Sequence, residues 1–188
     1  MLFVKDLLFP SILTSLKDNS SLLCELQAMK TNRLVPDVSQ DFDHLLRTIQ
    51  YLLDIGSDFD VIRSRHENPR NLTVVIANRA NAFRVIADSV VPVLLGARMP
   101  VLISVSEEPH VAVYAAFKQI LEEASFPAGN LEVCFTQNPS ASVFSSSSLP
   151  INVLFCGPME TGVELQKLGA AAGACRVIVG EYKSKMAP

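Results

Sequence analysis

The segment that could carry chemistry most directly is a glycine-containing turn between a predicted strand and a predicted helix. Residues 155–162 read FCGPMETG. Backbone N–H groups at the start of a helix, together with the helix dipole, favour a phosphate group. Gly157 and Gly162 suit such a turn, whereas Pro158 has no N–H to offer. A plain strand-to-helix connection explains the same residues, so phosphate binding and simple chain reversal both stay open.

The cysteines and histidines form no recognisable metal site or catalytic pair. The four cysteines contain no C-x-x-C spacing, and the three histidines are isolated in the sequence. A structural zinc site uses closely spaced ligand pairs. Cys134 and Cys156 end apolar runs, where burial would raise the thiol pKa and keep the groups unreactive. We therefore expect no metal site, no catalytic residue and no nucleophilic thiol.

The composition excludes several classes of protein. The chain has 188 residues, 49% of them hydrophobic, with 16 basic against 19 acidic residues and no tryptophan. A general nucleic-acid binder needs a clustered basic face, and a membrane span needs about 20 consecutive apolar residues. The N-terminus lacks the basic segment and long apolar core of a signal peptide. We expect a cytoplasmic protein that binds neither nucleic acid nor membrane.

We predict a single domain over residues 1–188. The elements that must position these residues begin with residues 1–66, which we predict to be helical and call the lead. Apolar residues recur at helical spacing near 7–16, 20–29 and 37–53. Pro10 interrupts the first of these segments, and the Asn19-Ser20-Ser21 triplet is typical of the N-cap of the second.

From residue 72 the pattern changes to short apolar runs that alternate with helical segments. The predicted strands are Leu72–Ala77, Pro100–Val105, Leu131–Phe135, Ile151–Cys156 and Arg176–Val179. Helices are predicted over 82–95, where Pro92 should bend or shorten the helix, and over 109–124 and 160–172. Wholly apolar strands are typical of a parallel sheet covered on both faces. We predict an α/β fold with an open, doubly wound parallel sheet over residues 72–180.

The ordered set of motifs resembles the coenzyme-binding half of the aldehyde dehydrogenase superfamily. Residues 155–162 are similar to the family's F-T-G-S-x-x-x-G turn, 95–107 to A-x-x-x-G-N-x-V-V-x-K-P-S-E, and 126–133 to L-P-x-G-x-x-x-V. Residues 74–83 take the place of the strand ending in P-W-N-F, and 176–185 are similar to V-x-L-E-L-G-G-K-S. The resemblance covers about residues 20–185 and implies a Rossmann-like coenzyme domain. It also implies a vestigial NAD(P) site at Glu107, Gly157, Pro158 and Gly162.

Departures from the family pattern bear on coenzyme binding. The lysine that grips the adenosine ribose in the family is replaced by Ser104, while its companion glutamate is retained as Glu107. The family's serine at the helix start is replaced by Pro158. Glu107 is equally explained as a first-turn partner of a helix dipole. The resemblance therefore implies that no cofactor is retained, with NAD(P) binding as the open alternative.

Other departures bear on catalysis. The family's oxyanion-binding asparagine would fall at Ala80 or, with a one-residue slip, at Asn81, which is also explained as a helix cap. Its general base would fall at Gly180 or Glu181, the latter also explained as a solvated residue. None of the four cysteines corresponds to the family's nucleophile, which belongs to a second domain. The resemblance implies a short, non-catalytic member that lacks the catalytic domain, a pseudoenzyme.

Two functions follow as expectations. The first is a structural or regulatory interaction subunit, and the second is an NAD(P)-binding module or sensor without dehydrogenase chemistry. The family uses the helix at 160–172 in its dimer contact, so the resemblance implies a homo-oligomer or another protein partner there. A full-length relative and a cytoskeletal or axonemal assembly are the further partner classes left open. The small residues of this helix are also explained by tight packing on its own sheet.

Overall fold

The computed structural model describes residues 5–55, 72–77, 81–96, 101–105, 108–137, 151–156, 158–172 and 175–180. The lead contains α1 (Lys5–Asp18), α2 (Ser20–Thr31) and α3 (Val35–Asp54). The remaining helical elements are α5 (Ala82–Val85), η1 (Ile86–Val90), η2 (Pro92–Gly96), α6 (Glu108–Glu123) and α8 (Met159–Ala172). The strands are β1 (Leu72–Ala77), β2 (Val101–Val105), β3 (Leu131–Phe135), β4 (Ile151–Cys156) and β5 (Cys175–Gly180).

The five strands form one sheet in the order β3-β2-β1-β4-β5, and every pairing is parallel. The chain winds outward from β1 to β3 and then returns to the other side of β1 for β4 and β5. This is the predicted doubly wound α/β arrangement, which is confirmed. Because all strands are parallel, their carboxyl ends lie along one edge of the sheet, where such folds form their binding crevice.

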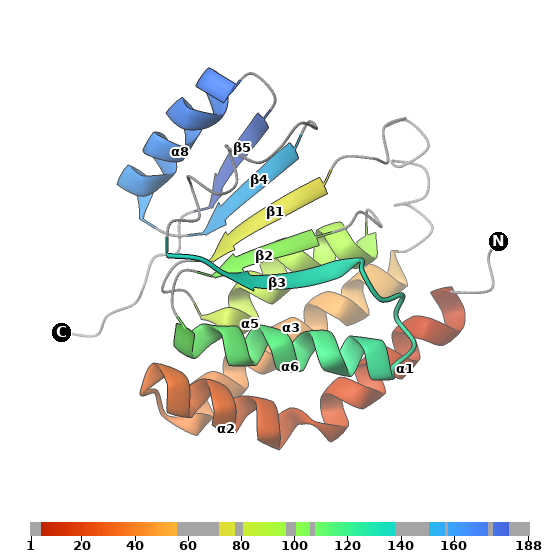
Figure 1. The fold of residues 1–188 in the computed structure, drawn as a ribbon. Coiled ribbons are helices and arrows are strands. Elements are labelled where there is room, and N and C mark those ends of the chain that lie inside the picture. The colour runs from red at the N-terminus through yellow and green to blue at the C-terminus, as the bar shows by residue number, and fades with distance from the viewer. Residues whose placement is uncertain are drawn as a thin grey trace.

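Helices cover the two faces of the sheet unequally. In Figure 1, α1, α2, α3, α5 and α6 lie on one side of the sheet and α8 lies on the other. Alternate residues of β1 face opposite cores: Val75 and Ala77 pack on the helical side, and Val74 and Ile76 on the α8 side. This alternation follows from the two-residue period of a strand, and it explains why β1 is apolar throughout.

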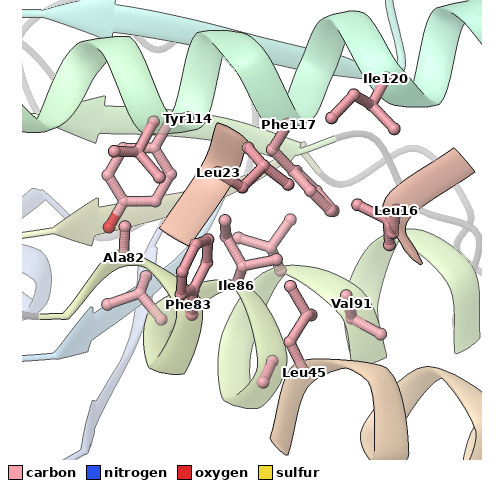
Figure 2. Packing of buried hydrophobic residues seen from close by; sticks show 14 of the residues in the cluster. Leu16, Leu23, Leu45, Ala82, Phe83, Ile86, Val91, Tyr114, Phe117 and Ile120 are labelled. Atoms are coloured by element: carbon pink, nitrogen blue, oxygen red, sulfur yellow. The ribbon is translucent and has the colours of Figure 1, made fainter. Parts of the chain in front are cut away.

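The core on the helical side joins the lead to the sheet. Figure 2 shows Leu16, Leu23 and Leu45 of the lead beside Phe83, Ile86 and Phe117. Phe42 of α3 meets Phe83 of α5 edge to face, with ring centroids 5.1 Å apart. The apolar sides of the lead helices are thus buried against α5, η1 and α6.

Pro92 does not shorten its helix, which was one of the two effects predicted for it. The helix that starts at Ala82 runs on to Gly96, with residues 86–90 and 92–96 in wide π turns. Proline lacks an N–H, and in an α-helix its ring collides with the carbonyl four residues earlier. A wider turn changes which carbonyl lies beneath the ring, so the helix continues instead of ending.

Asn19, within the predicted triplet, is the N-cap residue of α2, but its side chain makes no cap bond to this helix. Its Nδ2 atom instead donates to the carbonyl oxygen of Ser15 at 2.8 Å, which satisfies a carbonyl at the end of α1. Among the described residues, no helix combines the length and apolar character needed to cross a membrane.

Candidate functional site

Three of the residues singled out by the sequence lie within or after the carboxyl ends of three neighbouring strands. Ser104 is the penultimate residue of β2, Asn81 follows β1, and Pro158 follows β4. Glu107 and Gly157, two of the four predicted coenzyme contacts, lie outside the described residues, as do Ala80 and Glu181. The geometry of the edge is therefore set out for Ser104, Asn81, Pro158 and Gly162.

Pro158 immediately precedes the first residue of α8. Its carbonyl oxygen accepts a hydrogen bond from the Gly162 N–H at 3.1 Å, so that donor is used within the helix. The orphan N–H groups of this helix start are those of residues 159–161, because proline contributes none. Glu160 is exposed in the first turn, where its carboxylate interacts favourably with the positive end of the helix dipole.

Gly162 lies against the edge strand β5. A Cβ atom at Gly162 would stand 2.5 Å from Cγ1 and 2.9 Å from Cγ2 of Val179. Such a separation is far inside van der Waals contact, so only glycine lets α8 approach β5 this closely. Helix-to-strand packing accounts for the glycine without a ligand.

Ser104 occupies an enclosed position in the sheet. It is 0% exposed, and its hydroxyl has no hydrogen-bond partner within the described part of the chain. Its neighbours in register are Ile76 of β1 and Cys134 of β3. A buried hydroxyl can supply neither the charge nor the reach of the lysine ammonium that the resemblance places here. Ser104 therefore supplies no cationic group at this position.

Asn81 is a helix cap, as one of its two interpretations predicted. Its Oδ1 atom accepts a hydrogen bond from the Phe83 N–H at 3.1 Å, and its Nδ2 atom donates to Oδ2 of Asp41. Both ends of the amide are engaged within the fold. The side chain is thus held on one side by Asp41 and on the other by the helix that it caps.

Asp41 is the centre of a polar cluster that sequence reasoning missed. The Asp41 side chain is 11% exposed, and its carboxylate accepts hydrogen bonds from Arg33 Nη2 at 2.8 Å, from Arg84 Nε at 2.8 Å and from Asn81 Nδ2. The cluster links the connection after α2, the middle of α3 and the start of α5. Because Asn81 and Arg84 follow Asp41 by 40 and 43 residues in the chain, no local sequence motif indicates the cluster.

The remaining reactive groups do not assemble into a site. Cys24 is buried, and loss of solvation raises the pKa of its thiol, an effect that a hydrogen bond with Ser39 partly offsets and the charge of Asp43 reinforces. The prediction that Cys134 is buried is wrong: it is half-buried, because β3 is an edge strand. The Cys156 side chain lies outside the described set. Within that set, no three potential ligands gather to hold a metal ion.

No protein-family model and no curated protein matches this chain. Solved structures do match. An NAD-dependent aldehyde dehydrogenase from Sinorhizobium meliloti is similar over 93% of this chain and 36% of its own, with a TM-score of 0.76 and 13% identity. Succinic semialdehyde dehydrogenase from Streptococcus pyogenes, in complex with NADP+, has a TM-score of 0.76 and 10% sequence identity, and the match covers 93% of this chain and 40% of that enzyme. Betaine aldehyde dehydrogenase from Staphylococcus aureus, in complex with NAD+, has a TM-score of 0.73 and 15% identity, and the match covers 94% of this chain and 38% of that enzyme.

These similarities confirm the Rossmann-like fold of aldehyde dehydrogenase type that the motif order implied. At 10–15% identity they bear on the fold alone. The chain spans between 36% and 40% of the length of these three enzymes.

Proposed function

We propose that this protein is a non-catalytic, aldehyde-dehydrogenase-like protein that acts as a structural or regulatory interaction subunit. The observation that carries the proposal is the burial of Ser104, which is 0% exposed at the position of the ribose-gripping lysine. The site thereby loses its principal cationic contact with a negatively charged coenzyme. Pro158 removes a further N–H from the helix start at which a phosphate would bind.

The engagement of Asn81 supports the absence of catalysis. A donor stabilises an oxyanion only when it is aimed at the position where the charge develops. The Asn81 amide is instead bonded to Asp41 and to the Phe83 N–H. An amide held on both sides cannot turn toward a substrate without breaking one of these two bonds.

The outer surface of α8 supports the interaction role. Met159, Val163 and Leu168 are exposed to 46%, 40% and 48%. A group of exposed apolar side chains on one helix is typical of a surface that meets another protein. We therefore propose the helix at 160–172 as the contact, in a cytoplasmic protein. The partner classes are a second copy, a full-length relative, and a cytoskeletal or axonemal assembly.

The second candidate function is an NAD(P)-binding module or sensor without dehydrogenase chemistry. Two of the similar structures hold NADP+ or NAD+. The close approach of Gly162 to β5 also suits a helix start that packs tightly at the coenzyme edge of a sheet. This function requires that the undescribed turn and the α8 amides alone hold the coenzyme.

Titration of the purified chain with NAD+ and NADP+ by calorimetry separates the two functions. We expect no binding at ~5 mM of either coenzyme, whereas a Kd below ~100 μM would establish the second function. The variant Ser104→Lys should lose stability without gaining affinity, because the position is enclosed. Turnover of aliphatic or aromatic aldehydes above a matched buffer control would overturn the non-catalytic role altogether.

A further inference from the structure

The outer edge of β3 carries backbone groups that the sheet does not use. β3 lies at the opposite end of the sheet from β5, with β2 as its neighbour (Figure 1). The carbonyl oxygen of Asn130 and the N–H of Thr136 are both bonded to β2, at 2.8 and 3.0 Å. Because successive residues of a strand direct these groups to opposite sides, the N–H and C=O groups of Leu131, Val133 and Phe135 point away from the sheet. Within the described part of the chain, no hydrogen bond satisfies them.

An edge of this kind fits an extended peptide chain. The three residues repeat their outward N–H and C=O groups about every 6.8 Å, which is the period of another strand. The strand, LEVCF, contains no proline or lysine of the kind that blunts the edges of sheets. Phe135 is 47% exposed and Val133 is half-buried, so apolar surface lies beside the unpaired groups. Strand addition therefore satisfies the backbone groups and covers apolar side chains together.

One ion pair lies across this edge. Leu131 and Val133 pack on the helical side of the sheet, so the Glu132 side chain starts from the α8 side. Lys118 belongs to α6 on the helical side, yet its Nζ atom is 2.7 Å from Oε2 of Glu132. Because β2 occupies the inner side of β3, the two side chains meet around the outer edge. This pair, which we call the latch, stands where an added strand would lie.

We propose that the outer edge of β3 binds an extended segment of a partner protein, antiparallel to β3, and that this segment displaces the latch. A basic residue of the segment replaces Lys118 opposite Glu132, and apolar residues on either side of it lie next to Val133 and Phe135 on the helical face. Antiparallel pairing is the stronger kind, and an antiparallel edge strand is common on an otherwise parallel sheet. The site is independent of the contact proposed for α8.

The latch sets how readily the segment binds. The Glu132 side chain is 53% exposed, and an ion pair exposed to solvent contributes little. Opening the latch therefore reduces the affinity by at most about fivefold. Removing Lys118 should restore that factor, because the basic residue of the segment then meets Glu132 without a competitor.

Fluorescence anisotropy of the full chain with a labelled peptide, Val-Thr-Val-Lys-Val-Thr-Val, tests the proposal. We expect a Kd below ~1 mM for wild type and binding about two- to fivefold tighter for Lys118→Ala. The same peptide with glutamate in place of lysine should bind at least about fivefold more weakly to both proteins. Glu132→Lys should reverse this preference, because the charge opposite the central residue is reversed. The matched control Lys167→Ala, an exposed change on α8, should leave both affinities unchanged.

Two N-methylated peptides separate strand addition from adhesion through side chains. With the lysine opposite Glu132, the N–H groups of the two flanking valines point at β3, and that of the lysine points away. Methylating both valine nitrogens should weaken binding by about tenfold or more, whereas methylating the lysine nitrogen should change it by less than about threefold. These comparisons need no variant protein, and circular dichroism checks the fold of the variants that are used.

Three results would overturn the proposal. They are no binding at ~1 mM peptide by either wild type or Lys118→Ala, methylated peptides that bind equally or in the reverse order, and a charge preference that Glu132→Lys leaves unchanged. None of them bears on the non-catalytic role, because coenzyme titration and aldehyde turnover do not depend on the β3 edge.

Discussion

The two faces of the sheet are stabilised to different extents. On the helical side, seven helical segments bury a continuous core that includes Phe42, Leu45, Phe83 and Phe117. On the α8 side, Leu165 is the α8 residue that joins the buried cluster of strand residues among those described. Because burial of apolar area is the main favourable term in folding, the described residues contribute more stability on the helical side than on the α8 side.

Two matched leucine substitutions should give the largest difference in the free energy of unfolding between the two faces of the sheet. Leu45 of α3 is 0% exposed and Leu165 of α8 is 1% exposed. Leu→Ala substitutions in cores cost about 2–5 kcal/mol, depending on how far the site can collapse. We expect Leu45→Ala to cost about 4 kcal/mol and Leu165→Ala about 2 kcal/mol, because a helix at the edge can shift inward. Urea unfolding measures both, and equal losses would contradict the proposed asymmetry.

Removal of the Asp41 carboxylate should be the next largest effect. Asp41→Ala leaves Arg33, Arg84 and Asn81 without their common acceptor. Because the two arginines are 35% and 39% exposed, water can partly solvate them, and we expect a loss of about 2–3 kcal/mol. Asp43→Ala, an exposed change on the same helix, is the control and should alter stability by about 0.5 kcal/mol or less. A similar effect of the two changes would show that the cluster is not stabilising.

Gly162→Ala tests the packing of α8 against β5 directly. The added methyl collides with Val179, whose branched side chain has little rotational freedom. Overpacking of this kind costs about 1–3 kcal/mol. The second change Val179→Ala removes both atoms that the methyl meets, so Gly162→Ala should cost measurably less in that background than in the wild type. An unchanged cost would place the strain elsewhere.

A substitution on the helical side should increase stability. Gln27 is 0% exposed, and neither its Nε2 nor its Oε1 atom has a hydrogen-bond partner among the residues that the structure describes. A buried polar group without partners is costly, so Gln27→Met, which preserves the shape, should stabilise the fold by about 1 kcal/mol. Thermal unfolding measures the gain, with Gln50→Met on the exposed side of α3 as the control. A lower melting temperature would show that the Gln27 amide is bonded in solution.

The sheet could be predicted from the sequence in detail. The predicted bounds of β1, β3 and β4 coincide with those observed, and β2 differs by one residue. Each strand is a short apolar run bounded by polar residues, a signal that is local and strong. Asn81 could be predicted as a cap for the same reason, because its partner Phe83 is two residues away.

The contacts that determine the site's chemistry could not be predicted. The partner of Asn81 on its other side is Asp41, and the reason for Gly162 is Val179 on a different element. The full burial of Ser104 likewise depends on how the neighbouring strands are covered. Such facts arise from tertiary packing between distant segments, which periodicity and capping rules do not encode.

The Asp41 cluster constrains the order in which the chain can fold during synthesis. The lead leaves the ribosome first, yet the Asp41 carboxylate acquires Asn81 and Arg84 only after about 40 further residues have been made. Until then a carboxylate destined for burial stays in water, and the apolar sides of α1–α3 have no sheet to cover. Contacts of this separation must wait for loop closure, which slows folding. The nascent lead is therefore the stretch of this protein that depends most on protection from aggregation before β1 and α5 emerge.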